Sequence, residues 1–310
     1  MPEDFSIIIT GQAAFGQSVL EKLLKAGENV VGIFCPPEKD GGRPDPIKVL
    51  AESNDIPVFQ FKRMRDQECI DEFVALNASL HVMAFVTDIV PDEIINAPKL
   101  GSIQYHPSLL PLHRGPSSIN WPIIQGDKKT GLSIFWPDDG LDTGPILMQK
   151  EVEIGPDDTL GTIYFDQLFG LGVDALVESV ALVKDGKAPK IEQDHSQMTY
   201  EGWCRAKDVI VDWGASGEDI YNLVRGSDPS PGAGSTYRGT PIQFYGTSND
   251  LEDFEGRSGT VIEISDKGVC VSMTNGRLWI SKVKPSGEKK STAAAWAAES
   301  GVQIGDVFGE

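Results

Sequence analysis

Residues 5–26 read FSIIITGQAAFGQSVLEKLLKA, and this stretch decides the fold of the first half of the chain. Its apolar start predicts a buried strand over 5–10. The glycines at 11 and 16 mark the two ends of a tight turn, and residues 17–26 predict a helix. The helix places four apolar residues on one face: Val19, Leu20, Leu23 and Leu24. A strand that turns directly into a helix is the repeating unit of parallel sheets.

The same alternation continues along the chain. Strands are expected over 29–34, 57–61, 80–85 and 101–105, and helices over 47–54 and 67–76. Strands alternating with helices predict an α/β fold with a doubly wound, mainly parallel, Rossmann-like sheet. Ligands of such sheets bind beyond the carboxyl ends of the strands, and His106 falls at such an end.

The pattern changes after residue 200. Before this point, a long helix is expected over about 159–184, followed by a polar connection. A helix over about 216–225 then precedes short β segments separated by Gly, Asn and Ser turns, over 240–245, 259–264, 269–273 and 278–283. We therefore expect a catalytic domain over 1–203 and a small OB-like β-barrel domain over 204–310.

Charge and cysteine usage narrow the class of protein. The 310 residues carry a formal net charge of −19, so the chain repels phosphate backbones and anionic membranes, and we expect neither nucleic acid nor a membrane as partner. The four cysteines form no CxxC pair, which favours reduced thiols in a cytoplasmic protein over disulfides or a metal site. The acidic N-terminus lacks the features of a signal peptide, and no apolar run reaches the length of a membrane helix.

The glycine turn GQAAFGQS at 11–18 differs by one residue from a phosphate-binding P-loop. Gln17 stands in place of the lysine that would meet the phosphates. The dinucleotide pattern also fails, because Ala13 replaces its central glycine. We expect a structural strand-to-helix turn.

Two loops carry the residues suited to catalysis, HPSLLPLHRG at 106–115 and DGLDTG at 139–144. The first holds the imidazole of His106 in a backbone that two prolines restrict. The second holds the carboxylate of Asp142 on a glycine-rich connection between expected strands over 132–136 and 145–150. Rigid scaffolds commonly carry catalytic residues on such loops. Each loop also has a simpler interpretation, His-Pro as a strand end and Asp-Gly-x-Asp-x-Gly as a turn.

Further motifs extend over essentially the whole chain. They are GQ at 11–12 with FGQ at 15–17, YHPSLLP at 105–111, INW at 119–121, GDKK at 126–129, IFW at 134–136, DDGLDTG at 138–144, GKAP at 186–189, TYE at 199–201 and RG at 225–226. In these motifs the chain resembles the folate-dependent formyltransferase family. It is most similar to the branch formed by the N-terminal hydrolase domain of 10-formyltetrahydrofolate dehydrogenase. The residue pairs NW at 120–121 and FW at 135–136 are typical of this branch.

The resemblance implies a substrate and a catalytic pair. The formyl donor would be 10-formyltetrahydrofolate, with no metal and no NADP used by this chain. His106 would donate to the formyl carbonyl, while Asp142 tunes that histidine and orders a water. The residue types suit these roles, because attack on an N-formyl carbon builds negative charge on oxygen, and an imidazole beside a carboxylate holds a proton to donate near neutral pH.

One position departs from the family pattern. Most formyltransferases have an Asn two residues before the histidine, whereas the dehydrogenase branch has an aliphatic residue there; this chain has Gln104. Gln104 is therefore a third candidate catalytic residue, as a donor to the oxyanion. The resemblance also places the folate against two loops, whose candidate binding residues are Thr87, Asp88, Ile89, Val90, Asp138, Gly140 and Leu141.

The acceptor of the formyl group stays open at this point. Water is the leading interpretation, and the products would then be tetrahydrofolate and formate. If the chain belongs to a larger protein with carrier and aldehyde dehydrogenase domains, the acceptor would instead be the carrier arm. An amine, either an amino sugar or methionyl-tRNA, is the alternative. Residues 205–310 hold 11 Lys and Arg against 15 Asp and Glu, a net charge of −4 that disfavours tRNA. A catalytically weak folate-binding module is the alternative from another class.

Overall fold

The computed structural model describes residues 5–39, 41–250 and 256–310. The chain divides into two compact units. The first comprises Met1–Pro116, Gly131–Val152 and Gln167–Tyr200, and the second Ser117–Thr130, Glu153–Asp166 and Glu201–Glu310. The expected boundary at 203/204 puts 117–130 and 153–166 with the first domain, whereas their contacts group them with the second unit.

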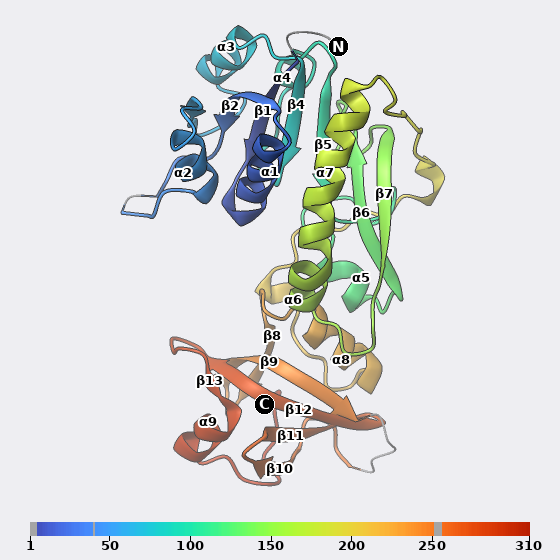
Figure 1. The fold of residues 1–310 in the computed structure, drawn as a ribbon. Helices are drawn as coiled ribbons and strands as arrows, with labels where there is room; N and C mark the ends of the chain where they lie inside the picture. Colours follow the sequence, from blue (N-terminus) through green and yellow to red (C-terminus); the bar gives the residue numbers. More distant parts are fainter. Residues whose placement is uncertain (1–4, 40, 251–255) are drawn as a thin grey trace. The chain divides into compact units, whose positions relative to one another are not determined.

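A seven-stranded sheet forms the centre of the first unit (Figure 1). Its strand order is β3 (Val58–Phe59), β2 (Asn29–Phe34), β1 (Ser6–Gly11), β4 (Leu80–Ala84), β5 (Ser102–His106), β6 (Lys129–Phe135), β7 (Ile146–Glu153). The pairs from β3 to β5 are parallel, and β6 runs antiparallel to β5. The predicted doubly wound, mainly parallel α/β fold is confirmed.

Helices cover both faces of this sheet. They are α1 (Ala13–Lys25), α2 (Pro46–Glu52), α3 (Gln67–Ala75), α4 (Asp92–Ile95) and α7 (Phe169–Lys184). α1 and α7 lie beside each other, while Phe73 of α3 and Ile94 of α4 join the core cluster that contains Ile8 and Phe34 of the sheet. The long helix expected over 159–184 is divided into α6 (Leu160–Thr162), a π-helical segment (Ile163–Leu168) and α7.

The second unit contains a separate antiparallel sheet, as predicted. Its order is β10 (Val261–Ser265), β11 (Gly268–Met273), β12 (Gly276–Pro285), β9 (Thr240–Asp250), β8 (Ala233–Tyr237), with β13 (Ser291–Thr292) paired to β12. Bridges from Phe308 to Tyr237 and from Val307 to Thr260 connect the two edges of the sheet through the last residues of the chain. Helices α5 (Asn120–Ile124), α8 (Gly217–Gly226) and α9 (Ala293–Ser300) also belong to this unit, as does α6.

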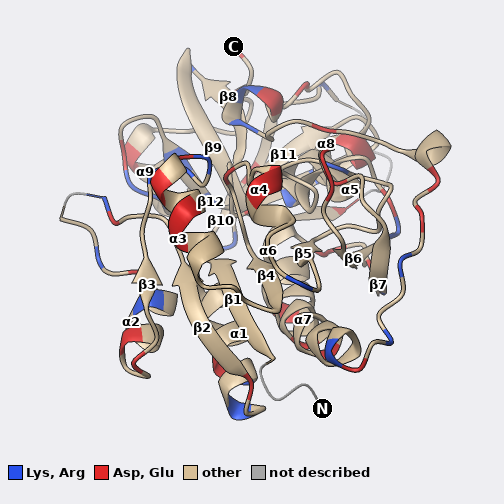
Figure 2. Ribbon diagram, turned by 90° about the horizontal axis from the view of Figure 1, so that it is seen from above, with Lys and Arg blue, Asp and Glu red and all other residues tan. Residues whose placement is uncertain are grey.

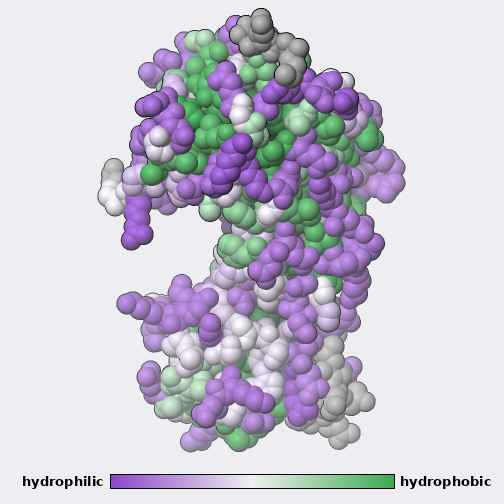
Figure 3. Space-filling view, viewed as in Figure 1, coloured by the Kyte–Doolittle hydropathy of each residue, from purple (hydrophilic) through white to green (hydrophobic). Residues whose placement is uncertain are grey.

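The surface is mixed in polarity and charge. Hydrophobic side chains reach the surface of the first unit among hydrophilic ones (Figure 3). In the second unit, acidic residues gather on α8, where Glu218 and Asp219 lie in the first turn (Figure 2). Within the described residues, no helix has the length and apolar character needed to span a bilayer.

Candidate functional site

His106 is the last residue of β5 and its side chain is buried, with 5% of the residue exposed. Its Nε2 donates a hydrogen bond to the carbonyl oxygen of His113 at 2.9 Å. Because a carbonyl only accepts, this contact places a proton on Nε2 and leaves Nδ1 as the atom that gains or loses one. Nδ1 lies 3.7 Å from Oδ2 of Asp142. The structure therefore brings together the two residues predicted as the catalytic pair.

The chain after His106 is held by hydrogen bonds rather than left as a loose loop. The hydroxyl of Ser133, on β6, donates to the carbonyl of Ser108 at 2.7 Å and accepts from the backbone N–H of Leu110 at 3.0 Å. The Ser108 hydroxyl in turn donates to the Leu112 carbonyl at 2.7 Å. These contacts fix the path that returns the His113 carbonyl to His106.

Asp142 lies on the connection between β6 and β7 and is 7% exposed. Its Oδ2 accepts a hydrogen bond from the backbone N–H of Gly115 at 2.9 Å, whereas Oδ1 has no hydrogen bond within the described residues. The loop packs tightly, because a Cβ on Gly144 would lie 1.8 Å from the carbonyl oxygen of Trp136. Only glycine fits at Gly144, which explains part of the DGLDTG pattern.

The other predicted residues of this loop have different surroundings. Oδ1 of Asp138 accepts from the backbone N–H of Gly140 at 3.1 Å and from the hydroxyl of Thr143 at 2.5 Å. Asp138 therefore shapes the turn through this oxygen. Leu141 presents an apolar side chain to solvent and is 56% exposed.

Gln104 lies two residues before His106 on β5, so both side chains leave the same face of the strand. It is half-buried and is paired in register with Phe135 of β6. Its side chain has no hydrogen bond among the described residues. The structure thus places Gln104 on the same strand face as His106 without assigning its amide to another partner.

The loop from Thr87 to Val90 follows β4 and is tied to neighbouring loops. Gln12 donates from Nε2 to the Thr87 hydroxyl at 3.2 Å. Asp88 accepts the backbone N–H of Met64 at 2.8 Å and of Ile89 at 2.9 Å. Val90 is buried in the core, whereas Ile89 is 73% exposed. Asp88 and Val90 thus support the loop, and Ile89 is the large apolar side chain that it exposes to solvent.

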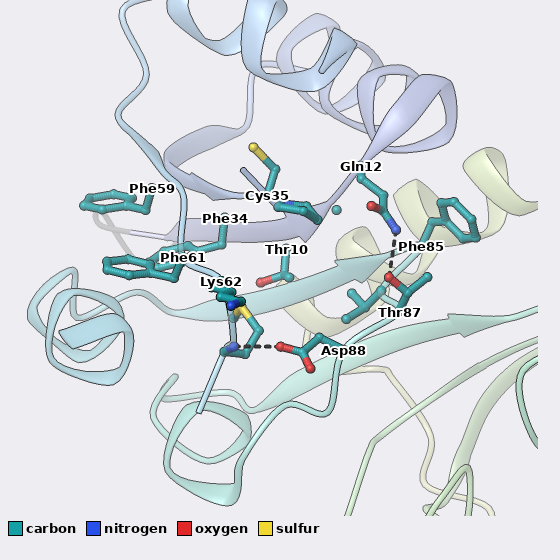
Figure 4. A pocket seen from close by; sticks show the side chains of 14 residues that line it. Thr10, Gln12, Phe34, Cys35, Phe59, Phe61, Lys62, Phe85, Thr87 and Asp88 are labelled. Carbon is teal, nitrogen blue, oxygen red and sulfur yellow. Dashed lines mark hydrogen bonds between the residues drawn. The ribbon is translucent and has the colours of Figure 1, made fainter. Parts of the chain in front are cut away.

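A cavity opens beside this loop at the carboxyl ends of β1, β2 and β4 (Figure 4). Thr87 and Asp88 line it, together with the aromatic rings of Phe34, Phe59, Phe61 and Phe85. His106 and Asp142 are not among its lining residues. Burial raises the pKa of the Cys35 thiol in this cavity to about 12, with Asp45 and Glu38 adding to the effect. Cys35 is consequently a protonated thiol at neutral pH and no nucleophile.

The glycine turn after β1 has the structural role predicted for it. The backbone N–H of Ala13, at the start of α1, donates to both carboxylate oxygens of Asp45, at 2.9 and 3.0 Å. Asp45 also caps α2 through the N–H of Ile47. A carboxylate of the chain itself thus occupies the helix end where a P-loop would bind phosphate.

Gln193, a buried residue beside the Asp142 loop, carries no signal in the sequence that marks it as part of the site. Gln193 lies in a segment expected to be a polar connection, and it is 5% exposed. Arg114, which follows His113 in the motif at 106–115, is also buried and is 4% exposed. Among the described residues, no group of three or more His, Cys, Asp and Glu side chains could hold a metal ion.

Comparison with known proteins identifies the relatives of this chain. The family model described as formyl transferase matches residues 4–179, and that described as formyl transferase, C-terminal domain, matches residues 204–301. Mitochondrial 10-formyltetrahydrofolate dehydrogenase of Mus musculus is 45% identical over 247 residues, which cover 78% of this chain and 27% of that protein. Methionyl-tRNA formyltransferase of Clostridioides difficile (strain 630) is 32% identical over 98% of this chain and 99% of its own.

A solved structure supports the fold over most of the chain. The N-formyltransferase from Helicobacter canadensis, in complex with folinic acid and dTDP-3-aminofucose, has a TM-score of 0.70 at 17% identity and covers 89% of this chain and 98% of its own. The chain spans only about a quarter of the length of the dehydrogenases that it matches.

Proposed function

The chain belongs to the formyl transferase family, and from this premise we propose that it releases the formyl group of 10-formyltetrahydrofolate to water, with His106 and Asp142 as the catalytic residues. The buried pair carries the proposal for the chemistry. An imidazole nitrogen 3.7 Å from a carboxylate, at the carboxyl end of a central strand, is a suitable donor to an oxyanion.

Each residue has a role that its contacts support. Nε2 of His106 stays bound to the His113 carbonyl, so Nδ1 carries the proton that meets the developing oxyanion. Oδ2 of Asp142 is held by Gly115, and Oδ1 remains to accept a proton from the attacking water. The water oxygen bonds to the formyl carbon, the bond from that carbon to N10 breaks, and N10 receives the proton that Asp142 took from the water. The products are formate and tetrahydrofolate.

Folate binding is proposed for the two loops next to the pair. Ile89 and Leu141, 73% and 56% exposed, offer apolar surface suited to a flat ring. The backbone groups of Thr87, Asp88 and Val90, and those of Asp138 and Gly140, supply hydrogen bonds to its edges. We place the chain in the cytoplasm and expect no metal ion in the reaction.

Water is favoured as acceptor by the 45% identity to the dehydrogenases and by the acidic second unit, which repels tRNA. In a longer dehydrogenase-like protein, carrier and aldehyde dehydrogenase domains would receive the formyl group, and NADP would be used outside this chain.

Transfer to an amine is the second candidate. It is favoured by methionyl-tRNA formyltransferase, which matches the chain over nearly its whole length, whereas the dehydrogenase matches 78% of it. The fold likeness to a sugar-binding N-formyltransferase points to amino sugars. The third candidate function is a folate-binding module without useful turnover.

A product assay separates these proposals. The chain is incubated with 10-formyltetrahydrofolate alone, with a thiol as surrogate carrier, with an amino sugar nucleotide, and with methionyl-tRNA. Equal amounts of formate and tetrahydrofolate without added amine are expected. Formylation of an amine that depends on His106, with no formate under any condition, would refute the hydrolase. Folate binding without any product would point to the non-catalytic module.

A further inference from the structure

Gln193 lies in the segment that runs alongside the start of β7. Ile191 and Ile146 form an antiparallel bridge, with N–H to carbonyl distances of 2.7 and 2.9 Å. Two residues further along this register, Gln193 comes opposite Gly144, the last residue of the loop that carries Asp142. This pairing places the buried side-chain amide of Gln193 beside the backbone of that loop.

Both ends of the Gln193 amide are engaged. Its Nε2 donates to the carbonyl of Asp142 at 3.0 Å and to the carbonyl of Gly144 at 2.7 Å. Its Oε1 accepts from the guanidinium of Arg114 at 2.6 Å. One side chain thus binds two carbonyls of the catalytic loop and is itself anchored by a buried cation.

The backbone of Asp142 needs such support. Its φ is +54°, in the left-handed region, which is strained for a residue other than glycine. A conformation of this kind persists only where the surroundings fix it. We propose that Gln193 is a positioning residue that clamps Asp142 in this conformation and so keeps its carboxylate facing His106; this role rests on the proposed catalytic pair.

A different role for Gln193 would be to serve only as partner of Arg114. The Arg114 guanidinium has no carboxylate partner among the described residues, and its contacts are Gln193, His195 and the sulfur of Met198. Gln193→Glu distinguishes the two roles. It strengthens the contact to Arg114 but sets a carboxylate oxygen against two carbonyl oxygens, so it impairs the clamp alone.

Kinetics of Gln193→Met and Gln193→Glu provide the first test. We expect kcat for formyl release to fall by about 10- to 100-fold in both variants while KM for 10-formyltetrahydrofolate changes by less than about threefold, because a displaced catalytic group slows the chemical step. Gln243→Met is the matched control. Its Nε2 donates to the Pro231 carbonyl at 2.9 Å within the second unit, and its kcat should match wild type. Wild-type kcat in Gln193→Glu would overturn the proposal.

A double-mutant cycle shows whether Gln193 acts through Asp142. In an Asp142→Asn background, Gln193→Met should lower kcat by less than about twofold, since the group that it positions is already lost. A further loss equal to that of the single variant would overturn the proposal.

Amide hydrogen exchange tests the clamp without catalysis. The Gly115 amide and residues 142–144 should exchange faster in Gln193→Met than in Gln243→Met. Unchanged exchange would overturn the clamp even in an active enzyme. If the wild-type chain releases no formyl group to any acceptor, the proposed function fails, while faster exchange in Gln193→Met would still support the clamp.

Discussion

Asp142→Asn tests the role of charge in the buried pair. Asparagine has nearly the same shape, and its side-chain oxygen can still accept the N–H of Gly115, which now lies 2.9 Å from Oδ2. The loop is therefore expected to keep its conformation. What disappears is the negative charge 3.7 Å from Nδ1 of His106, together with any base for the attacking water.

The expected magnitude follows from the distance. Two unit charges at 3.7 Å, in surroundings with an effective dielectric constant of about 20, attract each other by about 4 kcal/mol. Loss of this energy from the transition state lowers the rate about 10³-fold. We expect kcat to fall by about that factor, with KM for 10-formyltetrahydrofolate nearly unchanged, because the pair acts on the reacting formyl group while other residues are proposed to hold the folate.

The assay measures formate and tetrahydrofolate under saturating 10-formyltetrahydrofolate, alongside thermal unfolding of each variant. Asp139→Asn is the matched control, because it removes an exposed carboxylate from the same loop. It should retain wild-type kcat. An Asp142→Asn enzyme within tenfold of wild type, or an equal loss in Asp139→Asn, would refute the reasoning and leave Asp142 as a turn residue.

Three other outcomes are expected. His106→Ala should lower formyl release by about 10²- to 10⁴-fold with little change in folate affinity, measured by fluorescence titration; a wild-type rate would contradict its role as donor. If the Gln104 amide donates to the oxyanion, Gln104→Leu should lower kcat by about 10²-fold and Gln104→Asn should preserve it. Equal rates in both variants would assign the chemistry to His106 and Asp142 alone. Burial lowers the pKa of His81 from 6.5 to about 3, so the unfolded chain binds a proton that the folded chain does not. The free energy of unfolding, measured by urea titration, should therefore fall by roughly 1 kcal/mol for each pH unit as the pH is lowered from 6.5 to 3. His81→Gln should reduce this pH dependence, and an identical slope in that variant would contradict the assignment to His81.

Sequence patterns alone predicted the seven strands of the first sheet and placed His106 at the end of β5, but they missed α4, α5, β8, β13 and α9. Alternating strand and helix patterns, with glycine turns between them, predict a parallel sheet, and His106 follows the apolar run of β5 directly. The lysine missing at Gln17 also identified the first turn as structural. These features depend on residues close together in the chain, where hydrophobic period and turn chemistry act.

Which distant side chains meet depends on the tertiary fold. The 3.7 Å approach of His106 to Asp142, the capping of α1 by Asp45, and the clamp from Gln193 to Gly144 all join segments more than 30 residues apart. Gln193 is one polar residue in a polar segment, and nothing in its neighbours marks it as buried. Such contacts arise from strand register and loop packing, which local sequence patterns do not encode, because a shift of one residue in register turns a side chain to the opposite face.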